Sequence, residues 1–196
     1  MALHVNFTID SKGITVPYPR LYDEIRKNHG FVDLRGKSDQ AAAIIEGQFS
    51  PALKQLLVAL AEPSSPLFSL GCDIGTHREG SKKKRFREAA GGYVQLMSSL
   101  YMATSPEGYR RFAEGIADNM NIVVAKDEWK LEFSLTAVQF NLDNFDAIIP
   151  SVWVWFFAYS ATTDQATASR ERLIAELGHL LLAPKVLHLL KSKDGK

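Results

Sequence analysis

The feature that most constrains the fold is the apolar segment at residues 147–160, in which aromatic and aliphatic side chains alternate. In a strand, Trp153, Trp155, Phe157 and Tyr159 would share one face, because successive side chains point to opposite faces. The even-numbered positions between them are apolar too, which is typical of a central, covered strand. We expect helices to cover this aromatic row. A ligand pocket and a homodimer interface through the sheet are the alternatives.

Other segments alternate in the same way and indicate further strands. Residues 3–10 and 67–74 each show a period of two, and so do residues 129–142. The apolar phase changes within residues 129–142, which predicts a β-bulge near Thr136. Residues 86–102 are compatible with one long strand or with a hairpin that turns at two adjacent glycines.

Helices are indicated by their starting residues. Ser50 and Ser105 each precede a proline and an amphipathic segment, and Thr162 precedes the long C-terminal one. Residues 19–29 also have helical spacing and end before a glycine, so a short helix is expected there. A turn is expected at residues 11–13, between two short strands.

These elements predict an α+β fold. Short connections between strands favour a mainly antiparallel twisted sheet of about five to seven strands, with helices packed largely on one face. The chain has 196 residues, of which 46% are hydrophobic and 23% charged, which fits one globular domain. We expect that domain to span residues 1–190 and to end in a frayed tail at residues 191–196.

A basic segment at residues 78–87 is the first candidate site. Its basic residues are Arg78, Lys82, Lys83, Lys84, Arg85 and Arg87. Such a group of positive charges, in a loop with glycines, could hold a phosphate- or carboxylate-bearing ligand. The order of residues differs from that of a P-loop, and a solvated loop is the simpler interpretation.

The second candidate site contains Cys72, Asp73 and His77, at the end of a predicted strand. Asp73 and His77 could act as acid and base beside the basic loop. Alternation places Cys72 with Phe68 and Leu70 in the core, where a thiol is inert. No metal-binding or cofactor-binding spacing is found, so no cofactor is expected.

The overall charge argues against some partners. The formal net charge is +1, so nucleic-acid binding is not expected. The sequence shows neither a secretory signal nor a membrane-spanning segment, which predicts a cytoplasmic protein. Two functional hypotheses remain. The first is a non-enzymatic binding or interaction protein, and the second is a small enzyme or ligand-binding domain whose anionic ligand is held by residues 78–87.

Overall fold

The computed structural model of the chain describes residues 3–22, 27–78, 88–100, 104–120, 128–142 and 145–191. Its strands are β1 (Leu3–Val16), β2 (Leu21–Tyr22), β3 (Lys27–Asn28), β4 (Leu67–Arg78), β5 (Glu88–Ser98), β6 (Glu128–Leu142) and β7 (Phe145–Ser160). Its helices are α1 (Ser38–Ala42), α2 (Ile45–Gln48), α3 (Pro51–Ala61), α4 (Pro106–Asn119), α5 (Thr163–Leu181), α6 (Pro184–Leu187) and the short 3-10 helix η2 (His188–Leu190).

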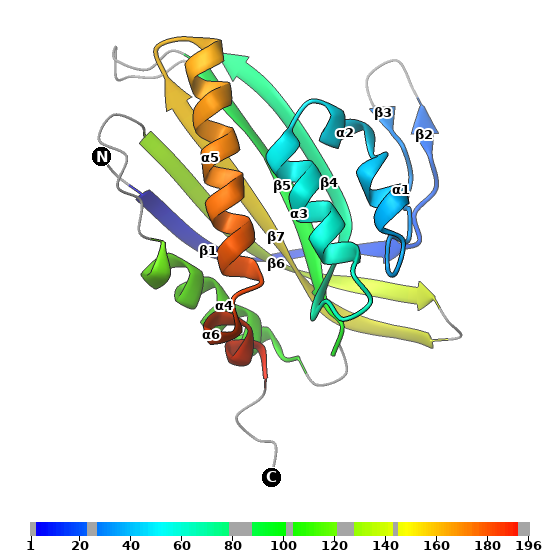
Figure 1. Ribbon diagram of the computed structural model, residues 1–196. Helices are drawn as coiled ribbons and strands as arrows, with labels where there is room; N and C mark the ends of the chain where they lie inside the picture. Colours follow the sequence, from blue (N-terminus) through cyan, green and yellow to red (C-terminus); the bar gives the residue numbers. More distant parts are fainter. Residues whose placement is uncertain are drawn as a thin grey trace.

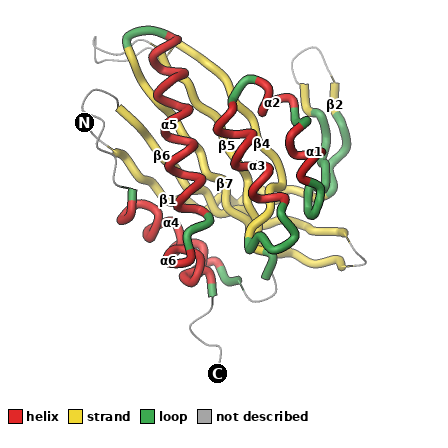
Figure 2. The backbone as a smooth tube through the Cα atoms, viewed as in Figure 1, coloured by secondary structure: helices red, strands yellow, loops and turns green. Residues whose placement is uncertain are grey.

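The main sheet has five strands in the order β1-β6-β7-β5-β4, and β2 pairs with β3 outside it. Within the main sheet, β1 and β6 are parallel and the other neighbours are antiparallel. Helices α3, α4 and α5 share one hydrophobic core with the sheet. Figure 1 shows α3 and α5 side by side in front of the strands, and Figure 2 shows the strands curving behind them. The α+β class, the mainly antiparallel sheet and the placement of the helices are therefore confirmed.

Hydroxyl side chains cap the N-termini of the three long helices, α3, α4 and α5, as predicted. Ser50 Oγ accepts a hydrogen bond from the N–H of Leu53 at 3.1 Å. Ser105 and Thr162 accept equivalent bonds from N–H groups three residues further on, at 3.1 and 3.3 Å. Glu171 of α5 strengthens the first cap, because it accepts bonds from Ser50 Oγ at 2.9 Å and from a backbone N–H of α3 at 3.1 Å. The start of α3 is thereby joined to α5.

The sheet is curled, so that the end of β1 returns to β4. Val16 of β1 packs with Phe68 and Leu70 of β4 and with Phe140 of β6 in a second hydrophobic cluster. This cluster lies on the face of the sheet opposite the long helices. The guanidinium of Arg35 covers it, at 5.2 Å from the ring centroid of Phe68 and 5.9 Å from that of Phe140. The face of the sheet opposite the long helices is called the open face below. Its end near Phe68 and Phe140 is covered by Val16 and Arg35.

This curl explains the change of phase in β6, and the bulge predicted near Thr136 is wrong. The register between β6 and β7 is continuous, so Leu135 and Val138 point to opposite faces. Leu135 belongs to the core under the helices, whereas Val138 belongs to the second cluster. The register irregularity lies instead in β1, between Asp10 and Ile14, within the segment expected to form a turn. Residues on both sides of it pair with β6, so β1 is one strand.

The helix predicted for residues 19–29 is also wrong, because β2 and β3 occupy both ends of that segment. The chain doubles back on itself, and the N–H of Phe31 donates to the carbonyl of Tyr18 at 3.0 Å. The two rings meet edge to face, with centroids 6.0 Å apart. Gly30 has a φ of +82°, which side-chain-bearing residues rarely adopt. Aromatic packing across the segment thus overrides its weak helical periodicity.

Strand β5 settles the alternative left open by the sequence, because Gly91 and Gly92 lie inside one strand and not at a hairpin turn. Both glycines allow close approach of a neighbour. A Cβ atom on Gly91 would overlap the ring of Phe157, and one on Gly92 would overlap the backbone carbonyl of Asp73. Strand β4 likewise continues to Arg78, further than predicted.

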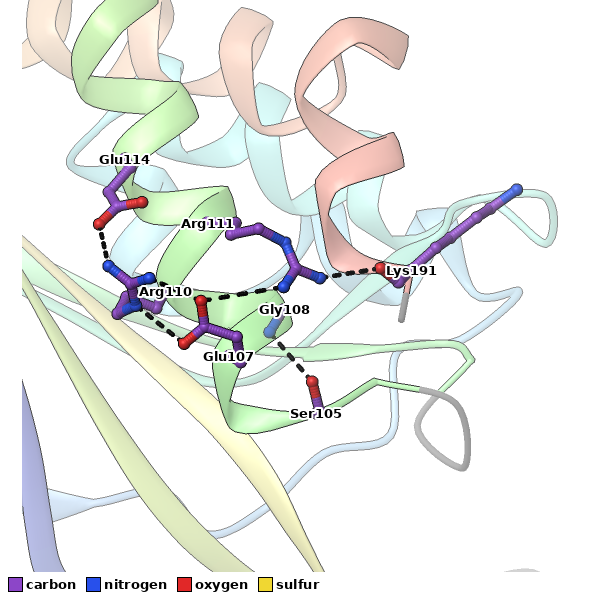
Figure 3. Close-up of polar contacts among 7 residues, drawn as sticks. All are labelled: Ser105, Glu107, Gly108, Arg110, Arg111, Glu114 and Lys191. Atoms are coloured by element: carbon purple, nitrogen blue, oxygen red, sulfur yellow. Dashed lines mark hydrogen bonds and ion pairs between the residues drawn. The ribbon is translucent and has the colours of Figure 1, made fainter. Parts of the chain in front are cut away.

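The C-terminal end of the described chain is held against α4 (Figure 3). The guanidinium of Arg111 donates to the carbonyl of Lys191 at 3.0 Å, and Thr104 forms an isolated bridge with Lys191. A Cβ atom on Gly108 would lie 2.6 Å from the carbonyl oxygen of Leu190, so the glycine permits this close packing. Among the described segments, no single helix is long and apolar enough to span a membrane. Helix α5 meets that test only together with the α6–η2 segment, from which it is bent by 64°.

Candidate functional site

A cavity of about 820 Å³ lies at the β4 edge of the sheet. One wall is the strap, by which we mean residues 17–22 and 27–34, which follow β1 and double back beside β4. The other walls come from the end of β1, from α2 with the residue before it, from α3, and from β4, β5 and β7. Small-molecule sites commonly have volumes of roughly 300–1,000 Å³, so the cavity is large enough for an organic ligand.

A β-bulge in β4 fixes the strap against the sheet. The register with β5 shifts between Ser69 and Gly71, which leaves Leu70 as the extra residue. The hydroxyl of Tyr18 donates a hydrogen bond to the carbonyl of Leu70 at 2.9 Å. A Cβ atom at position 71 would lie 2.7 Å from that hydroxyl oxygen, so the absence of a side chain makes room for the tyrosine. Bulges often occur beside functional sites, where they redirect a strand.

Aromatic rings form the sheet side of the cavity. Trp153 and Tyr93 both line it, with ring centroids 4.5 Å apart. Trp155 packs beside them on the same face of the sheet: its ring stacks on that of Trp153 with centroids 5.5 Å apart and an interplanar angle of 10°, and its centroid lies 4.8 Å from that of Tyr93. Gln95 also lines the cavity and is 1% exposed, and its amide donates to Ser151 Oγ at 2.9 Å. This wall is held by packing and by a buried hydrogen bond.

The ionisable groups of the cavity give it acidic character. Glu46 and Asp73 line it, and none of the described lining residues is a lysine or an arginine. Burial raises the pKa of the Cys72 thiol, and the carboxylates of Glu46 and Asp73 raise it further. Burial also raises the pKa of Tyr18 to about 12, with smaller contributions from Cys72 and Glu46. The pKa of Tyr93 is raised for the same main reason. The thiol and both phenols are therefore uncharged at neutral pH.

The predicted aromatic row is only partly in this site. Trp153, Trp155, Phe157 and Tyr159 share one face of β7, as expected, and all four are partly buried. That face is turned away from α3 and α5, so the expectation that helices cover the row is wrong. Trp153 lines the cavity, whereas the other three are absent from its described walls. The sequence pattern could not separate them, because all four have the same alternation.

The predicted anion site cannot be placed. Lys82, Lys83, Lys84, Arg85 and Arg87 lie outside the described residues. His77 and Arg78 are described in their backbone alone, at the end of β4. Of the two predicted acid–base candidates, Asp73 has a described side chain, and it is exposed at the cavity.

The environment predicted for Cys72 needs a correction. Phe68 and Leu70 belong to the second cluster, but the bulge shifts the alternation, and Cys72 pairs with Val94 on the helix side. Its side chain is partly buried and packs against the main core. The prediction of an unreactive thiol agrees with its raised pKa, since the thiolate is the nucleophilic form.

The sequence reasoning missed Tyr18, Glu46, Tyr93 and Gln95, which come from separate parts of the chain. A glycine inside a strand pattern, such as Gly71, is a sign of a bulge or a close approach and could have pointed to this edge. Among the residues with described side chains, no group of three or more His, Cys, Asp or Glu residues could hold a metal ion.

No family model, curated protein or solved structure matches this chain. The basis for assigning a function to the candidate site is therefore its own geometry.

Proposed function

We propose that the protein binds a small organic molecule in the cavity at the β4 edge, and that it acts by binding and not by catalysis. The observation that carries this proposal is the cavity of about 820 Å³, in whose sheet-side wall Trp153 stacks on Trp155 and the buried Gln95 amide is fixed by its hydrogen bond to Ser151. A wall fixed in this way supports binding, because little side-chain freedom would be lost when a ligand enters.

The acidic lining supports an uncharged or cationic ligand over the anionic one suggested by residues 78–87. The enzyme hypothesis remains as the alternative, and Asp73 is the described residue that would serve it. The Cys72 thiol in the cavity wall is not an activated nucleophile, because its pKa is raised.

The test is a thermal-shift panel of neutral, cationic and anionic aromatic compounds on the whole chain. A ligand present at a hundred times its Kd stabilises the folded state by about 2.7 kcal/mol. For a chain of this size that corresponds to a rise in Tm of roughly 5–11 °C. Absence of any rise across the panel would refute binding in the cavity.

Two neighbouring isoleucines provide a matched pair of variants. Ile44 lines the cavity, whereas Ile45 is 44% exposed and does not line it. Ile44→Trp should fill the cavity and abolish the ligand-dependent rise, and Ile45→Trp should leave it intact. Equal responses of the two variants would place the ligand elsewhere.

The rest of the aromatic row supports a separate proposal, a homodimer through the open face of the sheet. Trp155, Phe157 and Tyr159 are partly exposed there, and aromatic residues are enriched at interfaces. Light scattering should then report twice the chain mass of 21.8 kDa. A mass of one chain at high concentration would refute this interface.

A further inference from the structure

We propose that the ligand is an organic cation, a primary ammonium on an aromatic or aliphatic body, bound between the carboxylates of Glu46 and Asp73 and the rings of Trp153 and Tyr93. This inference rests on the proposed binding function and deepens it, because it assigns the chemical class of the ligand.

The charge of the lining is the first support. Glu46 lies in α2 and Asp73 in β4, so the two carboxylates reach the cavity from different walls. Both act on the same central groups: each raises the pKa of the Cys72 thiol and that of the Tyr93 phenol. The described lining contains no lysine or arginine to neutralise them, and His29 is its remaining basic side chain. A ligand with a positive charge would be attracted to the two carboxylates.

The hydrogen-bonding capacity of the lining points to the same kind of ligand. Carboxylates are acceptors, and an ammonium group offers three donors and no acceptor. Tyr18 already donates its hydroxyl hydrogen to the carbonyl of Leu70. Its hydroxyl oxygen therefore offers an acceptor, not a further donor, to the cavity. An ionised carboxylate on the ligand would face unfavourable charges at the same positions.

The aromatic wall is the second support. Indole is the side chain that attracts cations most strongly through its ring face, and phenol does so too. Trp153 and Tyr93 are both in the wall, and Trp155 stacks beside Trp153 with ring centroids 5.5 Å apart. The cavity is also much larger than an ammonium group alone. Apolar side chains at Leu34 and Leu57 line it as well, so the ligand should carry a hydrophobic body.

The experiment compares three probes that share one aromatic body and differ in charge: 2-phenylethylammonium, 2-phenylethanol and phenylacetate. Kd values are measured by isothermal titration calorimetry on the full chain. The ammonium compound should bind about tenfold more tightly than the alcohol, and phenylacetate should bind most weakly. Equal or tighter binding of the alcohol, or of phenylacetate, would overturn the inference.

Variants test the residues assigned to the charge. Glu46→Gln and Asp73→Asn should each lower the preference for the ammonium compound over the alcohol by about three- to tenfold, while leaving the Kd of 2-phenylethanol unchanged. Asp118→Asn is the matched control, because Asp118 is an exposed acid on α4 outside the described cavity walls. A preference that persists in both cavity variants would overturn the assignment of these carboxylates.

The outcomes also separate this inference from the proposed function. If 2-phenylethanol binds, and Ile44→Trp abolishes that binding, then the cavity is a ligand site whatever the charge preference. If none of the three probes binds, the inference fails, whereas the cavity proposal fails only if the full thermal-shift panel also gives no rise.

Discussion

The contact between Tyr18 and Gly71 provides a sharp test of how the strap is held on the sheet. The tyrosine hydroxyl donates to the carbonyl of Leu70 at 2.9 Å and lies where a Cβ atom at position 71 would be 2.7 Å away. Two substitutions, Tyr18→Phe and Gly71→Ala, disturb this one contact from opposite sides. They should therefore be strongly non-additive.

The magnitudes follow from the geometry. Tyr18→Phe removes one partly buried hydrogen bond and should cost about 0.5–1.5 kcal/mol. Gly71→Ala alone should cost about 1–3 kcal/mol, because the tyrosine must move away from the new methyl group. In the Tyr18→Phe background the nearest ring atom is the Cζ position, 3.9 Å from the Cβ atom, which is an ordinary contact. There, Gly71→Ala should be neutral or stabilising by up to about 1 kcal/mol, since the unfolded chain loses freedom.

The assay is urea unfolding of the wild type, both single variants and the double variant, followed by far-ultraviolet circular dichroism. A coupling free energy of about 1–4 kcal/mol is expected, with unchanged denaturant slopes. Gly75→Ala is the control in both backgrounds, because its Cβ atom would meet no atom within 4 Å. Additivity within about 0.3–0.5 kcal/mol would refute the placement of the strap.

The same phenol gives an independent check at high pH. Burial raises the pKa of Tyr18 to about 12, compared with about 10 in an unfolded chain. A raised pKa means that the folded state holds the proton longer, so this contribution to stability is complete below about pH 10 and is lost as the pH rises toward 12. The stability of Tyr18→Phe should therefore fall less steeply than that of the wild type over that interval. Identical slopes would contradict the burial of the phenol.

Three further changes test other parts of the fold. Ser169→Ala should cost about 1–3 kcal/mol, because it removes the partner of the buried Trp129 Nε1, 2.6 Å away; an unchanged urea midpoint would count against that bond. Gly108→Ala should destabilise by about 1–3 kcal/mol through its clash with the C-terminal backbone, whereas intrinsic helix propensity alone predicts a gain of up to about 1 kcal/mol. Arg35 holds the pKa of Asp33 below its usual range, so the stabilisation from this ion pair is present above about pH 4 and is lost as the pH falls further. The difference in unfolding free energy between the wild type and Asp33→Asn should therefore shrink in acid. A difference that stays constant would contradict the ion pair.

Local signals predicted the parts of the fold that depend on neighbours in sequence. Ser50 and Ser105 cap their helices because a hydroxyl followed by proline specifies a helix start within a few residues. The strands with strict alternation were predicted for the same reason. The cavity depends instead on long-range pairing. The bulge at Leu70 becomes visible once β4 is aligned with β5, and the curl that brings Val16 to β4 depends on the whole sheet.

The incorrect prediction of a helix at residues 19–29 shows how local sequence pattern and long-range packing compete. Its helical spacing was real but short, and isolated short helices are marginal in water. Tyr18 and Phe31 gain more by packing on each other and on the second cluster, which a helix starting directly after Tyr18 would prevent. A site wall was thus misassigned because its structure is determined by contacts across the strap.

The aromatic row on β7 packs against residues of β5, and this packing bears on whether the row needs a binding partner. Phe157 lies over Gly91, where a side chain would overlap its ring, and Tyr93 packs against both Trp153 and Trp155. The rings therefore bury much of their surface sideways, along the sheet, without a second layer of helices. Because this lateral packing already holds the row together, its large side chains do not by themselves demand a covering partner. Trp153 differs from the rest of the row in bordering a cavity, so a change at this residue should affect ligand binding more than the same change at Phe157.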